Sequence, residues 1–242
     1  MLIATLNHNL PDLTDNLVLQ LERDPLFKEC ELMVVDNGSK IHVAKSTTHT
    51  LEENIFFGGG FNVILDYFLT TDHDYFCVLN NDLIFHGYKF LSTIHNTLKE
   101  DNIDLYSPSI VQGSINQCKW TPMLNWGTKG LREVPMIDFQ IPFISRRLAE
   151  DIKQFPNELY LGYGLDFYAS IICKRKGYKI VVDDSITVCH LENQTIKQDK
   201  LNTISKEKYY NDNITNLINY FSNSEYKDDF QDLWIKGENY KF

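Results

Sequence analysis

The chain lacks the cysteine patterns of a zinc knuckle or a disulfide framework. Its five cysteines are scattered through 242 residues, and none belongs to a CxxC pair. Zinc knuckles use closely spaced cysteines, and disulfide frameworks in secreted domains use an even set. The sequence therefore indicates neither, and a reducing compartment fits best.

Long apolar runs and basic clusters are also missing. No window approaches the roughly 20 consecutive apolar residues of a membrane-spanning helix. The N-terminal segment has no basic region followed by a long apolar stretch. The net charge is −10, from 23 Lys+Arg against 33 Asp+Glu, and no basic run is present to attract nucleic acid or anionic lipid. We expect a cytoplasmic protein with no membrane span and no general nucleic-acid surface.

What is present suits one α/β domain. The residues are 43% hydrophobic and 13% aromatic, without repeats or low-complexity linkers, so we expect a single domain over residues 1–242. Strands are predicted at 2–6, 32–35, 48–51, 75–79, 104–110, 134–145 and 179–183, and helices at 11–23, 61–69, after Leu165, at 205–221 and in the tail to Phe242.

Polar clusters follow several of the apolar runs in the first half of the chain. Asn7 follows the first run, Asp36-Asn37-Gly38-Ser39 the second, and Asn80-Asn81-Asp82 the fourth. Strands that alternate with helices predict a doubly wound, mostly parallel sheet. Ligands of such sheets bind at the carboxyl ends of the strands, where these clusters should meet.

These clusters, with further segments in the second half, resemble the motifs of family 2 glycosyltransferases of the GT-A fold. The matching segments, in order, are Thr5-Leu6-Asn7, Val34 to Ser39, Asn54 with Gly59 to Asn62, Leu79 to Asp82, Tyr163 to Phe167, Lys176 to Ile180 and Val188-Cys189-His190. The likeness extends over about Met1 to Gln194 and is closest to the rhamnosyltransferase-like branch, which builds polysaccharides and surface glycans.

The resemblance implies an inverting transfer from a UDP-, TDP- or GDP-sugar to a hydroxyl of a glycan or another acceptor. Residues 1–100 would form the nucleotide-sugar-binding half. Residues 101–200 would form a less regular acceptor and catalytic half, and 201–242 a C-terminal helical extension. The donor-binding residues implied are Thr5, Asn7, Asp36, Asn37, Gly59, Gly60, Asn62, Asn80 and Asn81. Several of these residues have an alternative. Asp36 could cap the turn after its strand, and Thr5 and Asn7 could simply start a loop. Gly59, Gly60 and Asn62 could be helix-entry residues that permit close packing.

The resemblance places the divalent metal, Mn²⁺ or Mg²⁺, on Asp82 and His190. A carboxylate and an imidazole suit these ions, which offset the charge of a departing diphosphate. A lone histidine is also often a structural residue. Asn80 stands where the family's DxD motif begins with Asp, which leaves one anionic ligand fewer.

Asp166 matches the family's general base, which takes the proton of the attacking hydroxyl. Leu165 replaces the family's usual Glu, and Asp166 could also be an acidic residue favoured at a helix N-terminus. Trp120, Trp126 and Tyr163 are the candidates for stacking on an acceptor sugar, although aromatic residues more often belong to the core.

Two other functions remain open at the level of the sequence. A nucleotide-sugar-binding protein without catalysis would account for Leu165 and Asn80. A nicotinamide-dependent oxidoreductase would use Gly58-Gly59-Gly60 as a dinucleotide loop. These glycines follow the third predicted strand rather than the first, and no GxGxxG is present.

Overall fold

The computed structural model describes residues 1–87, 89–111, 121–191 and 205–240. Strands are β1 (Leu2–Asn7), β2 (Glu31–Asn37), β3 (His49–Leu51), β4 (Tyr75–Leu79), β5 (Leu83–Phe85), β6 (Leu105–Ile110), β7 (Leu131–Glu133), β8 (Phe143–Ser145) and β9 (Ile180–His190). Helices are α1 (Pro11–Leu21), α2 (Phe56–Leu69), α3 (Phe90–Asp101), α4 (Arg146–Ile152), α5 (Leu165–Lys176), α7 (Lys206–Asn223) and α8 (Lys227–Glu238), with 3₁₀ helices η1 (Pro25–Glu29), η2 (Thr121–Met123) and η3 (Asn157–Leu159).

The strands described form one sheet of order β3-β2-β1-β4-β8-β6-β9-β5, with β7 also paired to β9. The N-terminal block β3-β2-β1-β4 is parallel throughout. Because β2 lies on one side of β1 and β4 on the other, the strand order reverses at β1. In open α/β sheets, the crevice at such a reversal is where ligands bind.

The second half of the sheet adds antiparallel neighbours. β8 runs antiparallel to β4 and β6, while β6 and β9 are parallel. β5 pairs antiparallel with β9, with Leu83 opposite His190. This pairing brings the end of β9 beside the residues that follow β4. The α/β architecture predicted from the sequence is confirmed, and so is its less regular second half.

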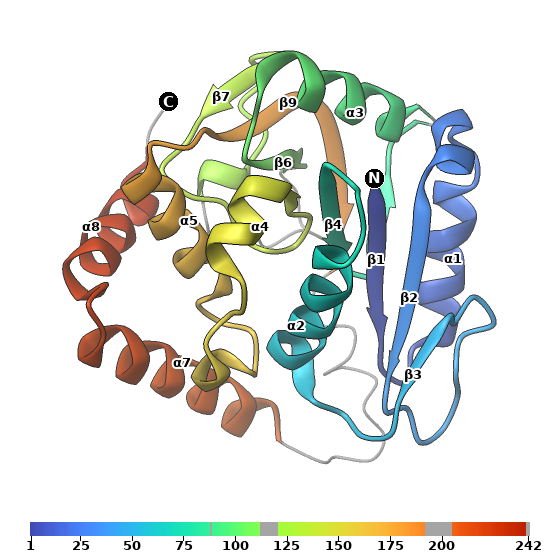
Figure 1. The fold of residues 1–242 in the computed structure, drawn as a ribbon, viewed down its shortest axis with the longest axis horizontal. Helices are drawn as coiled ribbons and strands as arrows, with labels where there is room; N and C mark the ends of the chain where they lie inside the picture. Colours follow the sequence, from blue (N-terminus) through green and yellow to red (C-terminus); the bar gives the residue numbers. More distant parts are fainter. Residues whose placement is uncertain (88, 112–120, 192–204, 241–242) are drawn as a thin grey trace.

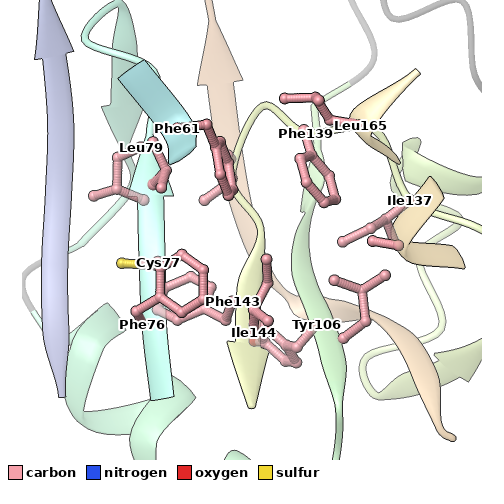
Figure 2. Packing of buried hydrophobic residues seen from close by; sticks show 14 of the residues in the cluster. Phe61, Phe76, Cys77, Leu79, Tyr106, Ile137, Phe139, Phe143, Ile144 and Leu165 are labelled. Carbon is pink, nitrogen blue, oxygen red and sulfur yellow. The ribbon is translucent and has the colours of Figure 1, made fainter. Parts of the chain in front are cut away.

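A continuous apolar core holds the sheet and the helices together. All residues of β1 except Leu6 are buried, which requires cover on both faces of the strand, and both α1 and α2 contact β1. Figure 2 shows Phe61 of α2 and Phe139 as neighbours within this core, and their rings stack at 5.2 Å. The core continues to Leu165 at the start of α5.

The two C-terminal helices close one side of the molecule. In Figure 1, α7 and α8 lie together beyond α5, away from β1 to β3. Phe167 of α5 stacks on Trp234 of α8 at 5.6 Å, and α7 contacts η3. No helix among the described residues is long and apolar enough to cross a membrane.

Three predicted elements differ clearly from those observed. The strand predicted at 179–183 continues to His190 in β9. The strand predicted over 134–145 is a strand only at Phe143–Ser145, because β8 is limited to the short stretch that pairs with β4 and β6. Helix α2 begins at Phe56, five residues before the predicted start, so the three glycines lie inside the helix. A Cβ on Gly58 would stand 2.4 Å from the Leu159 carbonyl oxygen, so close packing requires glycine at this helical position.

Candidate functional site

A hydrogen-bonded network joins the carboxyl ends of β1 and β2. The Asn7 side-chain nitrogen donates to Asp36 Oδ1 at 2.7 Å and to Ser39 Oγ at 3.3 Å. The Asn7 oxygen accepts from Leu10 N and from the Thr14 hydroxyl. Both donors and both lone pairs of the Asn7 amide are therefore used within the protein. Asn7 positions Asp36, whose other oxygen accepts from Ser39 N at 3.0 Å.

Three more predicted donor residues lie at the same edge of the sheet. Thr5 is buried and donates to the Leu79 carbonyl at 2.8 Å, which links β1 to β4. Asn37 donates to the Phe56 carbonyl and accepts from Ile55 N, which anchors the start of α2. Asn81 donates to the Thr14 hydroxyl at 3.1 Å.

Three other predicted donor residues, Gly59, Gly60 and Asn62, lie in α2, where they make packing contacts. A Cβ on Gly60 would stand 2.7 Å from a methyl group of Leu6, and one on Gly59 would stand 3.0 Å from Ile55. The Asn62 amide donates to the Phe155 carbonyl at 3.0 Å and accepts from Phe155 N at 2.8 Å. These contacts support the packing alternative for Gly60 and Asn62.

Asp82 and His190 meet across the β5–β9 pairing. Asp82 Oδ1 lies 3.0 Å from His190 Nε2, and both side chains are buried. Leu191 N donates to the Asp82 carbonyl at 3.0 Å, which fixes the register of the two segments. The Asn80 amide nitrogen lies 3.3 Å from the same imidazole nitrogen. Two predicted metal ligands, 108 residues apart in the sequence, are thus brought into contact.

The Asp82–His190 pair fits a divalent cation. Mg²⁺ and Mn²⁺ take oxygen ligands, and an imidazole also suits Mn²⁺. Two ligands at right angles on an ion with bonds of about 2.1 Å lie about 3.0 Å apart, which matches the separation of these two atoms. No set of three or more His, Cys, Asp or Glu side chains in the described ranges could hold an ion. An ion here would draw its other ligands from phosphate and water.

Asp166 lies in the first turn of α5 and is buried beside a second acid. Burial and then the negative charge of Asp138 raise the pKa of Asp166 to about 8. Backbone N–H groups, including that of Phe167 at 2.9 Å, oppose this shift. Burial outweighs the favourable helix N-terminus, because desolvation penalises a carboxylate more than partial dipole charges stabilise it.

Asp138 connects the two halves of the site. Burial raises the pKa of Asp138, and both a hydrogen bond from Gln140 at 2.9 Å and the charge of His190 oppose this shift. Asp138 therefore interacts electrostatically with both His190 and Asp166. Sequence reasoning missed this residue. A signal was present, because a single acid interrupts the apolar run Met136-Ile137-Asp138-Phe139.

Asp82, Asp138, Asp166 and His190 form a group that we call the acidic cluster, and Tyr163 lies close enough to feel the charges of Asp138 and Asp166. Burial, the neighbouring tyrosines and then the charges of Asp138 and Asp166 raise the pKa of Tyr163 well above its ordinary value. The Tyr163 backbone N–H donates to Asn213 of α7 at 3.2 Å. The loop that carries Tyr163 to Asp166 is thus held by the C-terminal extension.

Of the two predicted acceptor tryptophans, Trp120 lies outside the described residues. Trp126 contacts another part of the molecule. Its backbone N–H donates to Asp184 at 3.2 Å, and its ring packs on Tyr240 at 6.4 Å. Asp184 forms a buried ion pair with Arg132. Trp126 therefore contacts Tyr240 and a structural ion pair. The acid of this pair, Asp184, lies on β9 six residues before His190.

Comparison with known proteins identifies the fold. No family model and no curated protein matches the chain by sequence. TarS (residues 1–349) of S. aureus in complex with UDP aligns with TM-score 0.63 and 14% identity, over 97% of this chain and 70% of that chain. GalNAc-T7 with UDP, GalNAc and Mn²⁺ aligns with TM-score 0.68 and 14% identity, over 95% and 49%.

The mannosyltransferase PcManGT from Pyrobaculum calidifontis, in complex with GDP-Man and Mn²⁺, aligns with TM-score 0.61 and 12% identity, over 97% of this chain and 69% of that chain. The chain thus spans about half of GalNAc-T7 and about 70% of the other two. These similarities show that the chain has the GT-A glycosyltransferase fold.

Proposed function

We propose that the protein transfers a sugar from a nucleoside diphosphate sugar to a hydroxyl acceptor, with inversion at the anomeric carbon. The observation that carries this proposal is the acidic cluster, which contains two carboxylates with raised pKa values and a carboxylate–imidazole pair. The GT-A fold and the motif resemblance support it. The resemblance also favours a glycan or polysaccharide as the product.

The donor site is proposed at the reversal between β1 and β4. Asp36 keeps lone pairs beyond its two protein contacts, so its carboxylate is suited to hydroxyl or amine groups of a nucleoside. Asn37, Asn80 and Asn81 line the same edge. We assign Asn7 and Thr5 to holding the strand ends in place, since their polar groups are already bonded to the protein.

Asp82 and His190 would hold Mn²⁺ or Mg²⁺ beside the diphosphate. When bound, such a cation supplies positive charge that offsets the two phosphates of the leaving group. Because Asn80 replaces an acid, Asp82 is the one carboxylate in the segment Asn80-Asn81-Asp82. The structure pairs it closely with His190, so we expect that both side chains must be present for tight binding.

Asp166 is proposed as the general base. As the acceptor oxygen forms its bond to the anomeric carbon, the bond from that carbon to the diphosphate oxygen breaks and the acceptor proton moves to the Asp166 carboxylate. A raised pKa suits this task, because a base whose pKa lies near the working pH accepts a proton readily. Asp138 sustains the raised value by its like charge. Tyr163 would contact the acceptor.

The test uses purified protein with a panel of UDP-, TDP- and GDP-sugars, with Mn²⁺ or with EDTA, and follows release of nucleoside diphosphate. We expect hydrolysis or transfer only with the metal. Asp166→Asn should bind donor and metal normally but transfer about 10²-fold more slowly, the usual scale for loss of a positioned base. His190→Ala should weaken the metal dependence, while an unchanged dependence would remove His190 from the metal site.

Three results would oppose the proposal. Absence of turnover with every donor, despite nucleotide binding, would make the chain a nucleotide-sugar-binding protein. Retention of anomeric configuration in the product, or normal transfer by a folded Asp166→Asn protein, would show that Asp166 is not the base of an inverting reaction.

A further inference from the structure

A polar groove lies between η3 and α7, outside the acidic cluster. Its volume is about 650 Å³, which is within the range of pockets that hold small ligands. Its lining includes Asn157, Glu158, Tyr160, Asn216, Asn219 and Tyr220. Amide and aromatic side chains dominate this set, and no lysine or arginine belongs to the lining.

Of the four asparagine side chains in the lining, Asn223 donates to the Asn219 carbonyl at 2.8 Å, and the other three are open to a ligand. Within the part of the chain that the structure describes, no hydrogen bond engages the side chains of Asn157, Asn216 or Asn219. Each can therefore donate two N–H groups and accept at its oxygen. Tyr160 is 42% exposed, and its ring packs edge-on against Phe56 at 5.3 Å, which holds an aromatic face at the rim.

This lining matches the chemistry of an uncharged saccharide. Sugar hydroxyls can accept hydrogen bonds from the asparagine amides and donate them to the amide oxygens and to the Glu158 carboxylate. The C–H face of a sugar ring can also pack on an aromatic ring. A phosphate or nucleotide would need cationic partners, which the lining lacks. An apolar ligand would leave the asparagine amides without partners, which is costly.

The groove also shares its walls with the loop that carries the proposed base. η3 ends two residues before Leu161, and α7 fixes that loop through two hydrogen bonds. The Tyr209 hydroxyl donates to the Leu161 carbonyl at 3.1 Å, and Tyr163 N donates to Asn213 at 3.2 Å. Tyr160 of the lining is three residues before Tyr163, so an oligosaccharide whose end lies at Tyr163 could extend along this groove.

We propose that the groove between η3 and α7 binds uncharged sugar units of an oligosaccharide acceptor, beyond the unit that receives the transferred sugar. The role as an acceptor subsite rests on the proposed function. Saccharide binding by the groove itself does not.

The experiment screens the full chain, without nucleotide, on an array of neutral and charged glycans and measures Kd for bound oligosaccharides by calorimetry. The double variant Asn216→Ala/Asn219→Ala removes two groove amides at helical positions where alanine is favourable. Asn211→Ala is the matched control, since Asn211 is an exposed asparagine of α7 outside the lining. We expect Kd to rise about tenfold in the double variant, the scale of losing about two hydrogen bonds, and to stay unchanged in the control.

Absence of neutral-glycan binding, binding of charged glycans alone, or equal affinities of the double variant and the control would each overturn the saccharide assignment. Nucleotide-sugar turnover, measured on the same proteins, separates this proposal from the proposed function. Turnover without groove-dependent glycan binding would refute the groove alone. Groove-dependent binding by a chain that turns over no nucleotide sugar would refute the transferase and leave the groove as a saccharide site.

Discussion

Replacing Asp166 by asparagine should stabilise the fold at neutral pH, and the gain should grow with pH. Asp166 has a pKa of about 8 in the folded protein against an ordinary value of 3.8. Between these values the folded state retains a proton that the unfolded chain has released, so the wild type loses stability as pH rises. Asparagine carries no charge, and Asp166→Asn removes this loss.

The size of the effect follows from the difference in pKa. Each pKa unit is worth about 1.4 kcal/mol. At pH 7 only the interval between the ordinary pKa of 3.8 and the pH counts, so the loss of stability in the wild type is at most about 4 kcal/mol. The new amide N–H group needs a partner in a buried place, at a cost of about 1–3 kcal/mol. We therefore expect a net gain of about 1–3 kcal/mol at pH 7 and a net loss of about 1–2 kcal/mol near pH 4, where the folded wild type carries an uncharged Asp166 and only the cost of the amide remains.

Urea unfolding of both proteins at pH 4 to 8, with EDTA present, measures this difference. The free energy of unfolding of Asp166→Asn relative to wild type should rise steadily across the range. A difference that does not change with pH would show that Asp166 ionises normally in the fold, and the physical account of the acidic cluster would be wrong.

Three further predictions follow from neighbouring contacts. Asp184→Asn should destabilise the fold by about 3–5 kcal/mol in urea unfolding, because it removes the charged partner of Arg132 from a buried ion pair. Stability equal to that of wild type would contradict this prediction. Asn62→Ala should cost about 1–3 kcal/mol by the same measurement, because two hydrogen bonds to Phe155 are lost, with nucleotide binding retained; loss of nucleotide binding in a stable variant would instead return Asn62 to the donor site. The kcat/KM for transfer should rise from pH 6 to 8 as Asp166 loses its proton, and a profile flat over that range would count against Asp166 as the base.

The sequence predicted the N-terminal half well because its signals are local. Each buried strand there is a short apolar run that stops at a polar residue, as β1 does at Asn7 and β2 at Asn37. Parallel strands align their carboxyl ends, so the position of these residues at one edge follows from the pattern itself. The resemblance to family 2 glycosyltransferases then supplied Asp82, His190 and Asp166 as candidates.

The parts that the sequence did not predict depend on contacts between distant segments. The three glycines resemble a turn, yet they lie inside α2 because η3, about 100 residues later, packs against Gly58. The segment 134–142 is apolar enough for a strand, but it folds as an irregular stretch that places Asp138 next to Asp166 and His190. Neither arrangement has a local signature.

Burial has opposite consequences for Asp184 and for the Asp166–Asp138 pair in the second half of the chain. Asp184 has Arg132 and Thr128 as donors, so its pKa is lowered and the charge is held favourably. Asp166 and Asp138 have raised pKa values and repel one another, so their burial costs stability at neutral pH. Packing alone would favour uncharged residues at both positions. This destabilising carboxylate pair lies beside the Asp82–His190 pair, and the arrangement supports our proposal that this end of the sheet carries out chemistry on a bound substrate.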